Sequence, residues 1–241
     1  MSFELAVSLA SFAAGAVAAV AGFGIGSILT PLLSHRIGVE LAIAAVSIPH
    51  LAATAVRFLM LRTSLDWAAF RSFGVASAAG GLTGALLHGA AGAPVLRVVF
   101  ASLLLLAAAS ELFGLARRVE LSAGGALVAG GLSGFFGGLV GNQGGIRSAA
   151  MLALPLRRDA FVATATATGL LVDAARMPVY FTVAGRELLG VAPLIAVATA
   201  GALAGTFAGR TLLGRIPERA FRLVIAGLLV VLALWMLAAR R

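Results

Sequence analysis

The sequence predicts an all-α polytopic membrane protein with about eight transmembrane helices and two short broken or re-entrant segments. Hydrophobic residues make up 61% of its 241 residues, charged residues make up only 11%, and the mean hydropathy is +1.07. A soluble domain usually carries about 25% charged residues, so this chain lacks the polar surface that would cover a water-facing globule. Its apolar runs are long and do not alternate, which favours helices over the strands of a membrane barrel.

Eight stretches approach the roughly 20 apolar residues that a helix needs to cross a bilayer. The first stretch contains Glu4 where a signal peptide would carry Lys or Arg, so we expect a transmembrane helix there and not a cleaved leader. The expected spans are residues 4–21, 39–61, 67–88, 95–115, 121–140, 158–181, 187–209 and 219–239.

Two further apolar stretches, residues 25–34 and 145–155, are too short to span a bilayer. Each directly follows a glycine-rich break, "AGFGIG" in one case and "VGNQGG" in the other. Short, glycine-interrupted segments at corresponding places in two halves of a chain are typical of broken helices that line a binding site.

The two halves of the chain resemble each other weakly. A shift of 119 positions places Gly22 on Gly141 and Arg57 on Arg176. The arginine pair is the informative one, because arginine is rare inside the expected spans. We therefore predict a duplication of about 120 residues within one integral membrane domain. The expected halves are residues 1–115 and 116–241.

The two glycine loops are candidates for an anion site. Clustered glycines can unwind the backbone at membrane depth where it lines a cavity. The helix that restarts after each loop presents free N–H groups and the positive end of its dipole. In the second loop, Asn142 and Gln143 add side-chain amides. Arg147 follows in the first helical turn, where the dipole disfavours a cation and a bound anion would compensate it.

Two alternatives remain open for this loop: Asn142 acts as a helix cap, and Arg147 snorkels to the headgroups. The candidate substrate-binding residues are Gly22, Gly24, Gly26, Arg57, Gly141, Asn142, Gln143, Gly144, Gly145, Arg147 and Arg176.

Ionisable residues inside the expected spans are candidates by default, because burying them is costly. Arg57 and Arg176 lie about five residues from the ends of their spans, where they could bind an anion or snorkel. His50 and Asp173 lie closer to the span centres and are candidates for proton coupling. The alternatives are a structural ion pair between Asp173 and Arg176, three positions apart, and a structural role for His50.

Several classes of function are disfavoured. The chain has no cysteine and no metal-ligand or catalytic motif, so we expect no metal, no cofactor and no enzymatic activity. The net charge of +9 comes from arginines placed one or two at a time between apolar runs, which does not suggest nucleic acid. The expected partners are a small anion and the lipid bilayer, and a homo-oligomer stays open.

The stretches "GFGIGSILTPLLS" and "GGLVGNQGGIRSAAMLALPL" resemble the two glycine signatures of the TauE/SafE family of sulfite exporters and 4-toluene sulfonate uptake permeases. This resemblance covers nearly the whole chain. It implies a cytoplasmic (inner) membrane transporter of small sulfur oxyanions or organosulfonates. It also implies that the glycines already named in both loops belong to the substrate site. The sequence departs from the family pattern at Asn142 and Gln143, which replace apolar and glycine residues.

The sequence thus predicts a secondary transporter of a small anion, with proton coupling through His50 or Asp173. The alternative is a passive anion channel.

Overall fold

The computed structural model describes residues 2–114, 121–152, 154, 156–213 and 216–238. Every element in these ranges is helical and none is a strand, which confirms the predicted all-α class. The elements are α1 (Phe3–Ala21), α2 (Ile25–Ile37), α3 (Val39–Leu61), η1 (Arg62–Ser64), α4 (Trp67–Ala69), η2 (Phe70–Gly74, a π-helical turn), α5 (Val75–Phe113), α6 (Ala123–Val140), α7 (Gly144–Leu152), α8 (Arg158–Gly190), α9 (Ala192–Leu213) and α10 (Glu218–Ala238).

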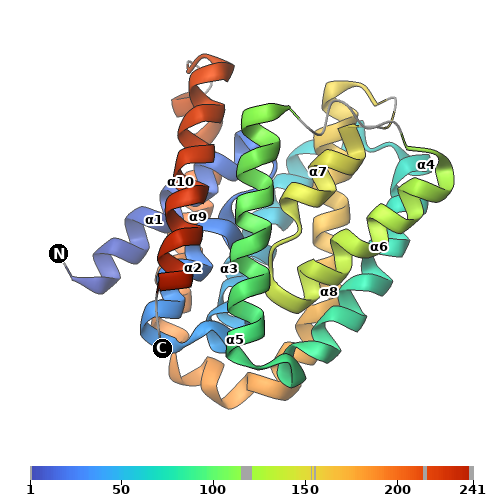
Figure 1. The fold of residues 1–241 in the computed structure, drawn as a ribbon. Coiled ribbons are helices and arrows are strands. Elements are labelled where there is room, and N and C mark those ends of the chain that lie inside the picture. The colour runs from blue at the N-terminus through green and yellow to red at the C-terminus, as the bar shows by residue number, and fades with distance from the viewer. Residues whose placement is uncertain (1, 115–120, 153, 155, 214–215, 239–241) are drawn as a thin grey trace.

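Two of the long helices contain a break in helical geometry. In α5 the break is at Gly92, whose φ of 71° and ψ of 151° lie outside the helical region, and Pro94 follows it. In α8 the break is at Ala184, with φ −125° and ψ 19°. Both breaks fall between pairs of spans that the sequence separates. Figure 1 shows the consequence in α5, whose first part runs beside α6 and whose second part turns to run beside α10.

Within the described residues, five helical stretches are long and apolar enough to cross a membrane, compared with eight expected spans. The expected spans 67–88 and 95–115 fall in one stretch because the helix continues through the Gly92 kink. The apolar part of α6 is slightly too short, and α8 carries six charged residues along its length. The five stretches are Phe3–Ala21, Val39–Ser64, Trp67–Phe113, Ala192–Gly209 and Arg219–Ala238.

The two segments that the sequence marks as too short are also short in the structure. Helix α2 has 13 residues and α7 has nine, so neither is long enough to cross a bilayer. Residues 153 and 155 of the second expected segment lie outside the described residues, as do residues 115–120 around the expected boundary between halves.

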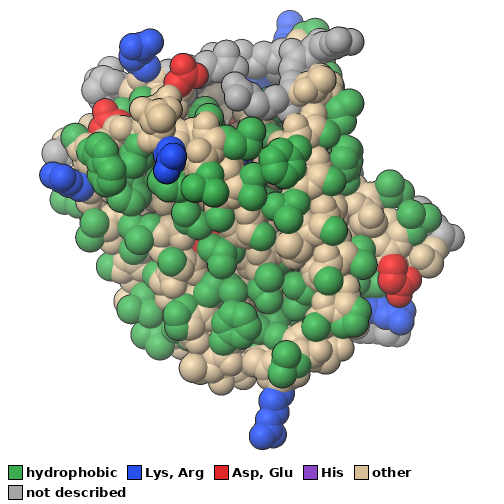
Figure 2. Space-filling view, turned by 180° about the vertical axis from the view of Figure 1, so that it is seen from behind, with side chains coloured by type: hydrophobic (Ala, Val, Ile, Leu, Met, Phe, Trp, Pro, Cys, Tyr) green, Lys and Arg blue, Asp and Glu red, His purple; other side chains and the backbone are tan. Residues whose placement is uncertain are grey.

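The outer surface is apolar over a broad band. Large side chains such as Leu59, Val128 and Val224 are more than 60% exposed. In Figure 2, hydrophobic side chains cover the middle of the molecule, and most of the charged side chains lie near its upper edge or project from its lower end and one side. This distribution suits a surface whose middle faces lipid and whose ends face water.

Glycines bring two pairs of helices into close backbone contact. A Cβ atom at Gly15 of α1 would collide with the carbonyl of Ala202 of α9, and one at Gly205 would collide with the carbonyl of Phe12. A Cβ at Gly138 of α6 would likewise collide with the carbonyl of Gly81 in α5. Small residues allow such approach where apolar burial gives no preference for protein over lipid. Helix α1 therefore packs on α9, and α6 packs on the first part of α5.

We expect Gly138→Ala to destabilise the protein, because the new methyl group meets the α5 backbone, which cannot move aside easily. Overpacking of this kind costs about 1–3 kcal/mol. The matched control is Gly124→Ala in the same helix, where the new Cβ atom meets nothing within 4 Å. That change should be neutral or slightly stabilising, because alanine favours a helix. Thermal unfolding in detergent measures both, and equal unfolding temperatures would contradict the close packing of α5 and α6.

Candidate functional site

The site begins where the backbone breaks between α1 and α2 and between α6 and α7. Helix α1 ends at Gly22 (φ 78°) and α6 ends at Gly141 (φ 72°), both in the left-handed conformation that glycine adopts readily. Each glycine N–H donates to the carbonyl four residues earlier, that of Ala18 or Gly137. Two non-helical residues follow each break before the chain becomes helical again.

The two breaks face each other across the interior. A Cβ atom at Gly26 would lie 2.6 Å from the carbonyl oxygen of Gly141. The hydroxyl of Ser27 donates to Oδ1 of Asn142 at 3.3 Å, and a Cβ atom at Gly144 would collide with Phe23. The structure therefore brings the first loop and the second loop, about 120 residues apart in sequence, into direct contact.

Two of the candidate glycines lie away from this contact. A Cβ atom at Gly145 would lie 3.0 Å from Ala107 of α5. A Cβ atom at Gly24 would lie 3.0 Å from Val17 of the preceding helix, α1. Gly24 has a φ of 139°, so its role is in the backbone conformation of the loop.

The arginines matched in the sequence make matched contacts. Arg57 Nη1 donates to the carbonyl of Ala18 at 2.5 Å, and Arg176 Nη1 donates to the carbonyl of Gly137 at 2.6 Å. These carbonyls lie in the last turns of α1 and α6 and already accept from the N–H groups of Gly22 and Gly141, so each arginine adds a second hydrogen bond at a helix end. Both arginine residues are at most 4% exposed, so neither snorkels to the surface. Capping of helix ends is a role that the sequence did not reveal.

Two more side chains continue this capping at the end of α6. The Tyr180 hydroxyl donates to the carbonyl of Gly138, and His88 Nδ1 lies 2.8 Å from the carbonyl of Leu139. Since a carbonyl only accepts, this nitrogen of His88 carries the proton. Arg176, Tyr180 and His88 thus satisfy three successive carbonyls. Tyr180 could have been found from the sequence, because it is the only tyrosine of the chain and follows Arg176 by four positions.

Asp173 contacts both His50, the other proton-coupling candidate, and Arg176, and the three side chains form one buried cluster. Its Oδ2 lies 2.6 Å from Nδ1 of His50 in α3, and its Oδ1 lies 2.7 Å from Nη2 of Arg176. Arg176 Nε donates to the same Oδ1 at 3.0 Å. The expected ion pair between Asp173 and Arg176 is therefore present, and His50 is its third member. The sequence did not indicate that His50 and Asp173 touch.

Arg147 is the least satisfied of the buried cations. It is 1% exposed, and its Nη2 donates to the carbonyl of Gly22 at 3.1 Å. Its Nε and Nη1 have no hydrogen-bond acceptor among the described residues. The guanidinium group lies against Gly169 of α8, where a Cβ atom would come within 2.6 Å of Nη1. Its burial excludes the snorkelling alternative.

The loop amides are also buried and unsatisfied. Gln143 is 3% exposed, and neither its Oε1 nor its Nε2 has a hydrogen-bond partner in the described chain. Asn142 uses Oδ1 for Ser27 but leaves Nδ2 without an acceptor there. Buried polar atoms are normally paired, so a group of unpaired donors in one region points to something that binds them.

The charge balance of the interior points in the same direction. Among the described residues, the buried charged side chains are Arg57, Arg147, Arg176 and Asp173, with His50 and His88 as the buried histidines. With neutral histidines, three cations and one anion leave two uncompensated positive charges. An isolated charge in an apolar interior is costly, and an anion bound among these groups would lower that cost.

A small cavity of about 200 Å³ adjoins the capped end of α6. It is lined by His88 and Tyr180 on the inside and by the exposed carboxylates Glu40 and Glu187 toward the surface. Tyr180 of this lining follows Arg176 by four positions in α8.

The family model of the sulfite exporter TauE/SafE family matches residues 7–236, nearly the whole chain. The chain therefore belongs to this family of membrane transporters, which confirms the resemblance and the prediction that it is not an enzyme. It is a multi-pass membrane protein. No curated protein and no solved structure matches the chain.

We expect Arg176→Gln to destabilise the protein more than Arg57→Gln does. Both changes remove a hydrogen bond from a charged donor to a buried carbonyl that keeps its glycine N–H, and such a bond contributes about 1.5–3 kcal/mol. Loss of Arg176 also leaves Asp173 as a buried carboxylate without its cation, and breaking such a pair costs about 3–5 kcal/mol.

Thermal unfolding in detergent gives the ranking, with Arg71→Gln as the control because Arg71 is exposed. Unfolding temperatures equal to that of the control would show that the caps carry no stability.

Proposed function

We propose that the chain is a secondary transporter of a small anion, a sulfur oxyanion or an organosulfonate, across the cytoplasmic membrane. The observation that carries this proposal is Arg147, a buried guanidinium whose Nε and Nη1 have no acceptor, and which has no carboxylate partner, among the described residues. A planar guanidinium matches the paired oxygens of an oxyanion, and charge-assisted hydrogen bonds of this kind are strong.

The proposed anion lies between the two loops. Arg147 supplies charge and donors from one side, and the amides of Asn142 and Gln143 supply further donors from the loop that precedes it. Their unpaired atoms support this placement. A site built from directional donors rejects ligands that leave them unpaired, so these amides determine which oxyanion is accepted. This role fits their departure from the family pattern.

Gly169 acts in this proposal as the residue that makes room for Arg147. Its φ is not positive, so glycine is not needed there for the backbone conformation. It is needed because any side chain would meet Arg147. A methyl group there would displace the Arg147 guanidinium from its present position. The sequence did not indicate this role, because a single glycine in a membrane helix is indistinguishable from a glycine that only permits close packing.

We further propose that the chain is a duplication with eight spans, in halves 1–115 and 116–241. The supporting observation is that corresponding contacts recur at one spacing of 119 positions. Gly22 and Gly141 end their helices in the same way, and Ala18 and Gly137 accept from Arg57 and Arg176. The first helix of each half packs on a helix of the other half, α1 on α9 and α6 on α5.

Proton coupling is proposed to run through His50 and Asp173. This proposal is supported by their 2.6 Å contact, which lies beside Arg176. Protonation of this pair adds one positive charge to the interior, which favours the anion, and loss of the proton favours its release. Anion and proton binding are therefore coupled electrostatically.

We expect Arg147→Gln to reduce anion uptake into proteoliposomes sharply. The loss of hydrogen bonds to a charged ligand costs about 1.5–3 kcal/mol, or roughly 10-fold to 100-fold in affinity. Gly169→Ala should raise KM in the same assay, although it removes no charge, because it moves the guanidinium. The control is Gly227→Ala in α10, where a new Cβ atom meets nothing within 4 Å. Uptake of sulfite, sulfate, thiosulfate and a sulfonate should be compared for each variant.

The uptake assay includes a check on folding, since Arg147 also contacts the first loop. Thermal unfolding and membrane yield of each variant are measured in parallel. A folded Arg147→Gln protein with unchanged uptake of every anion would remove Arg147 from the site and end the proposal.

His50→Gln tests coupling with little structural change, because glutamine can still donate to Asp173 but does not titrate. We expect this variant to lose uptake driven by a pH gradient while it retains counterflow of labelled against unlabelled anion. Retained pH-driven uptake would contradict a role for His50. Counterflow also separates the two functional classes, because a passive channel does not accumulate label against its gradient.

A further inference from the structure

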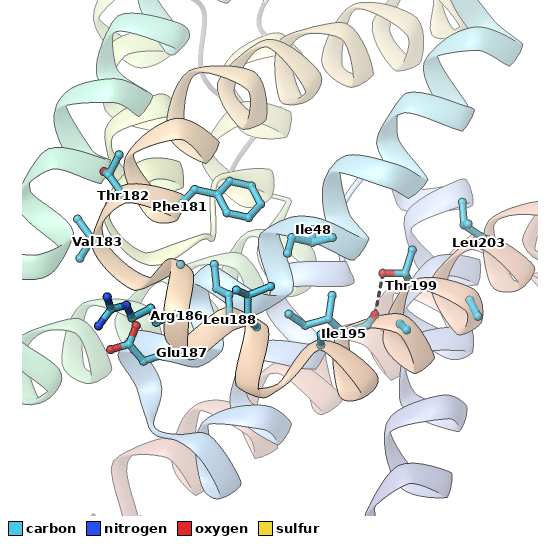
Figure 3. Close-up of a pocket in the computed structure, with 15 residues that line it drawn as sticks. Ile48, Phe181, Thr182, Val183, Arg186, Glu187, Leu188, Ile195, Thr199 and Leu203 are labelled. Atoms are coloured by element: carbon cyan, nitrogen blue, oxygen red, sulfur yellow. Dashed lines mark hydrogen bonds between the residues drawn. The ribbon is translucent and has the colours of Figure 1, made fainter.

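A large groove lies on the outside of the molecule, away from the buried cluster. It has a volume of about 1020 Å³ and is formed by α9 and by α8 around its break at Ala184, with Ile48 of α3 at its base. Figure 3 shows Arg186 and Glu187 together at one end of the groove and Leu203 at the other. The groove is therefore charged at one end and apolar along its length.

The floor of the groove is a row of small residues on one face of α9. Ala192, Ala196 and Ala200 follow each other at intervals of four, and all three are exposed. In a membrane helix, such a row permits close approach of a neighbour. No helix among the described residues covers it, so the row is open to the surroundings of the protein.

The two threonine hydroxyl groups in the groove already have hydrogen-bond partners, so they do not indicate a polar ligand. Thr199 donates to the carbonyl of Ile195 at 2.7 Å, the bond drawn in Figure 3, and Thr182 donates to the carbonyl of Val179 at 2.8 Å. Both hydroxyls are satisfied within their own helices. Along its length, the groove therefore offers methyl groups and other apolar surface, which suits an alkyl chain.

The length of the groove also matches one half of a bilayer. The lining residues of α9 extend from Ala192 to Leu203, which is about 17 Å at 1.5 Å per residue. The hydrocarbon core of a bilayer is about 30 Å thick, so one leaflet is about 15 Å. An acyl chain lying along α9 would fill the groove and keep its headgroup beside Arg186 and Glu187.

The charged end indicates the kind of headgroup. Arg186 and Glu187 are exposed, and neither has a hydrogen bond or ion pair within the described part of the chain. A neighbouring cation and anion complement a headgroup that carries both charges. A phosphate can accept from Arg186, and a primary ammonium can donate to Glu187, whereas a quaternary ammonium has no N–H to donate.

We propose that this groove binds one phospholipid with a phosphate and a primary ammonium in its headgroup, as in phosphatidylethanolamine, with an acyl chain along α9. The site is separate from the proposed anion site, and its test does not depend on transport.

The experiment uses the full chain in nanodiscs of phosphatidylethanolamine and phosphatidylcholine in equal amounts, followed by mild delipidation and native mass spectrometry. We expect one retained lipid per protein, with phosphatidylethanolamine in about threefold to fivefold excess, the range of an exposed ion pair. Glu187→Gln should abolish this excess while retaining lipid, and Arg186→Gln should lower the retention of both lipids.

The groove itself is tested with Ala196→Phe, whose ring would occupy the floor and should remove the retained lipid. The matched control is Ala13→Phe, an exposed alanine on α1 outside the groove. Equal retention of the two lipids by the unaltered protein would overturn the proposal, and so would lipid retention by Ala196→Phe equal to that of Ala13→Phe. A dimer that Ala196→Phe dissociates would assign the groove to a second copy of the chain instead.

Discussion

The polar interior is organised around two matching hydrogen bonds. Each one runs from a buried guanidinium to a carbonyl in the last turn of a helix. Helices α1 and α6 stop inside the molecule, where the carbonyls of Ala18 and Gly137 each keep one backbone donor, the N–H of the glycine that follows the helix. A carbonyl can accept a second hydrogen bond, and a bond from a charged donor contributes about 1.5–3 kcal/mol. Arg57 and Arg176 supply these second donors. These bonds tie α3 to the end of α1 and α8 to the end of α6, beside the two loops that form the buried polar region.

The caps also explain the charge of the interior. Guanidinium groups satisfy carbonyls well because they are rigid, multiple donors, but each brings a positive charge. Arg176 is balanced by Asp173, which it shares with His50. Arg57 and Arg147 have no such partner among the described residues. The excess charge is thus partly a by-product of capping, and the proposed anion would compensate it.

The sequence was sufficient for features with a local signature. Hydropathy gave the helical class, and the glycine loops gave the breaks at Gly22 and Gly141. The matched positions of Arg57 and Arg176 indicated a shared role, but not what that role was. A backbone carbonyl has no sequence signature, so the acceptors at Ala18 and Gly137 could not be named. The number of long apolar helices also differed, because a kink such as Gly92 bends a helix without ending it.

Contacts between distant segments could not be predicted from the sequence, for a related reason. His50 and Asp173 lie 123 positions apart, and nothing local to either residue predicts their 2.6 Å contact. His88 and Gly169 were missed because their roles depend on what lies opposite. His88 faces the end of α6, and Gly169 faces a guanidinium.

The proposed duplication also shows how one site could arise from a symmetric scaffold. The caps are the same in both halves, but many other positions differ at the spacing of 119, and three of them bear on the site. Arg147 corresponds to Ile28, Gly169 to His50, and Asp173 to Thr54. These differences are mutually consistent, because Gly169 leaves space for Arg147, and His50 reaches the carboxylate that exists only in the second half. The repeated residues build the breaks, and the residues that differ between the halves make the proposed anion site one site and not two equivalent ones.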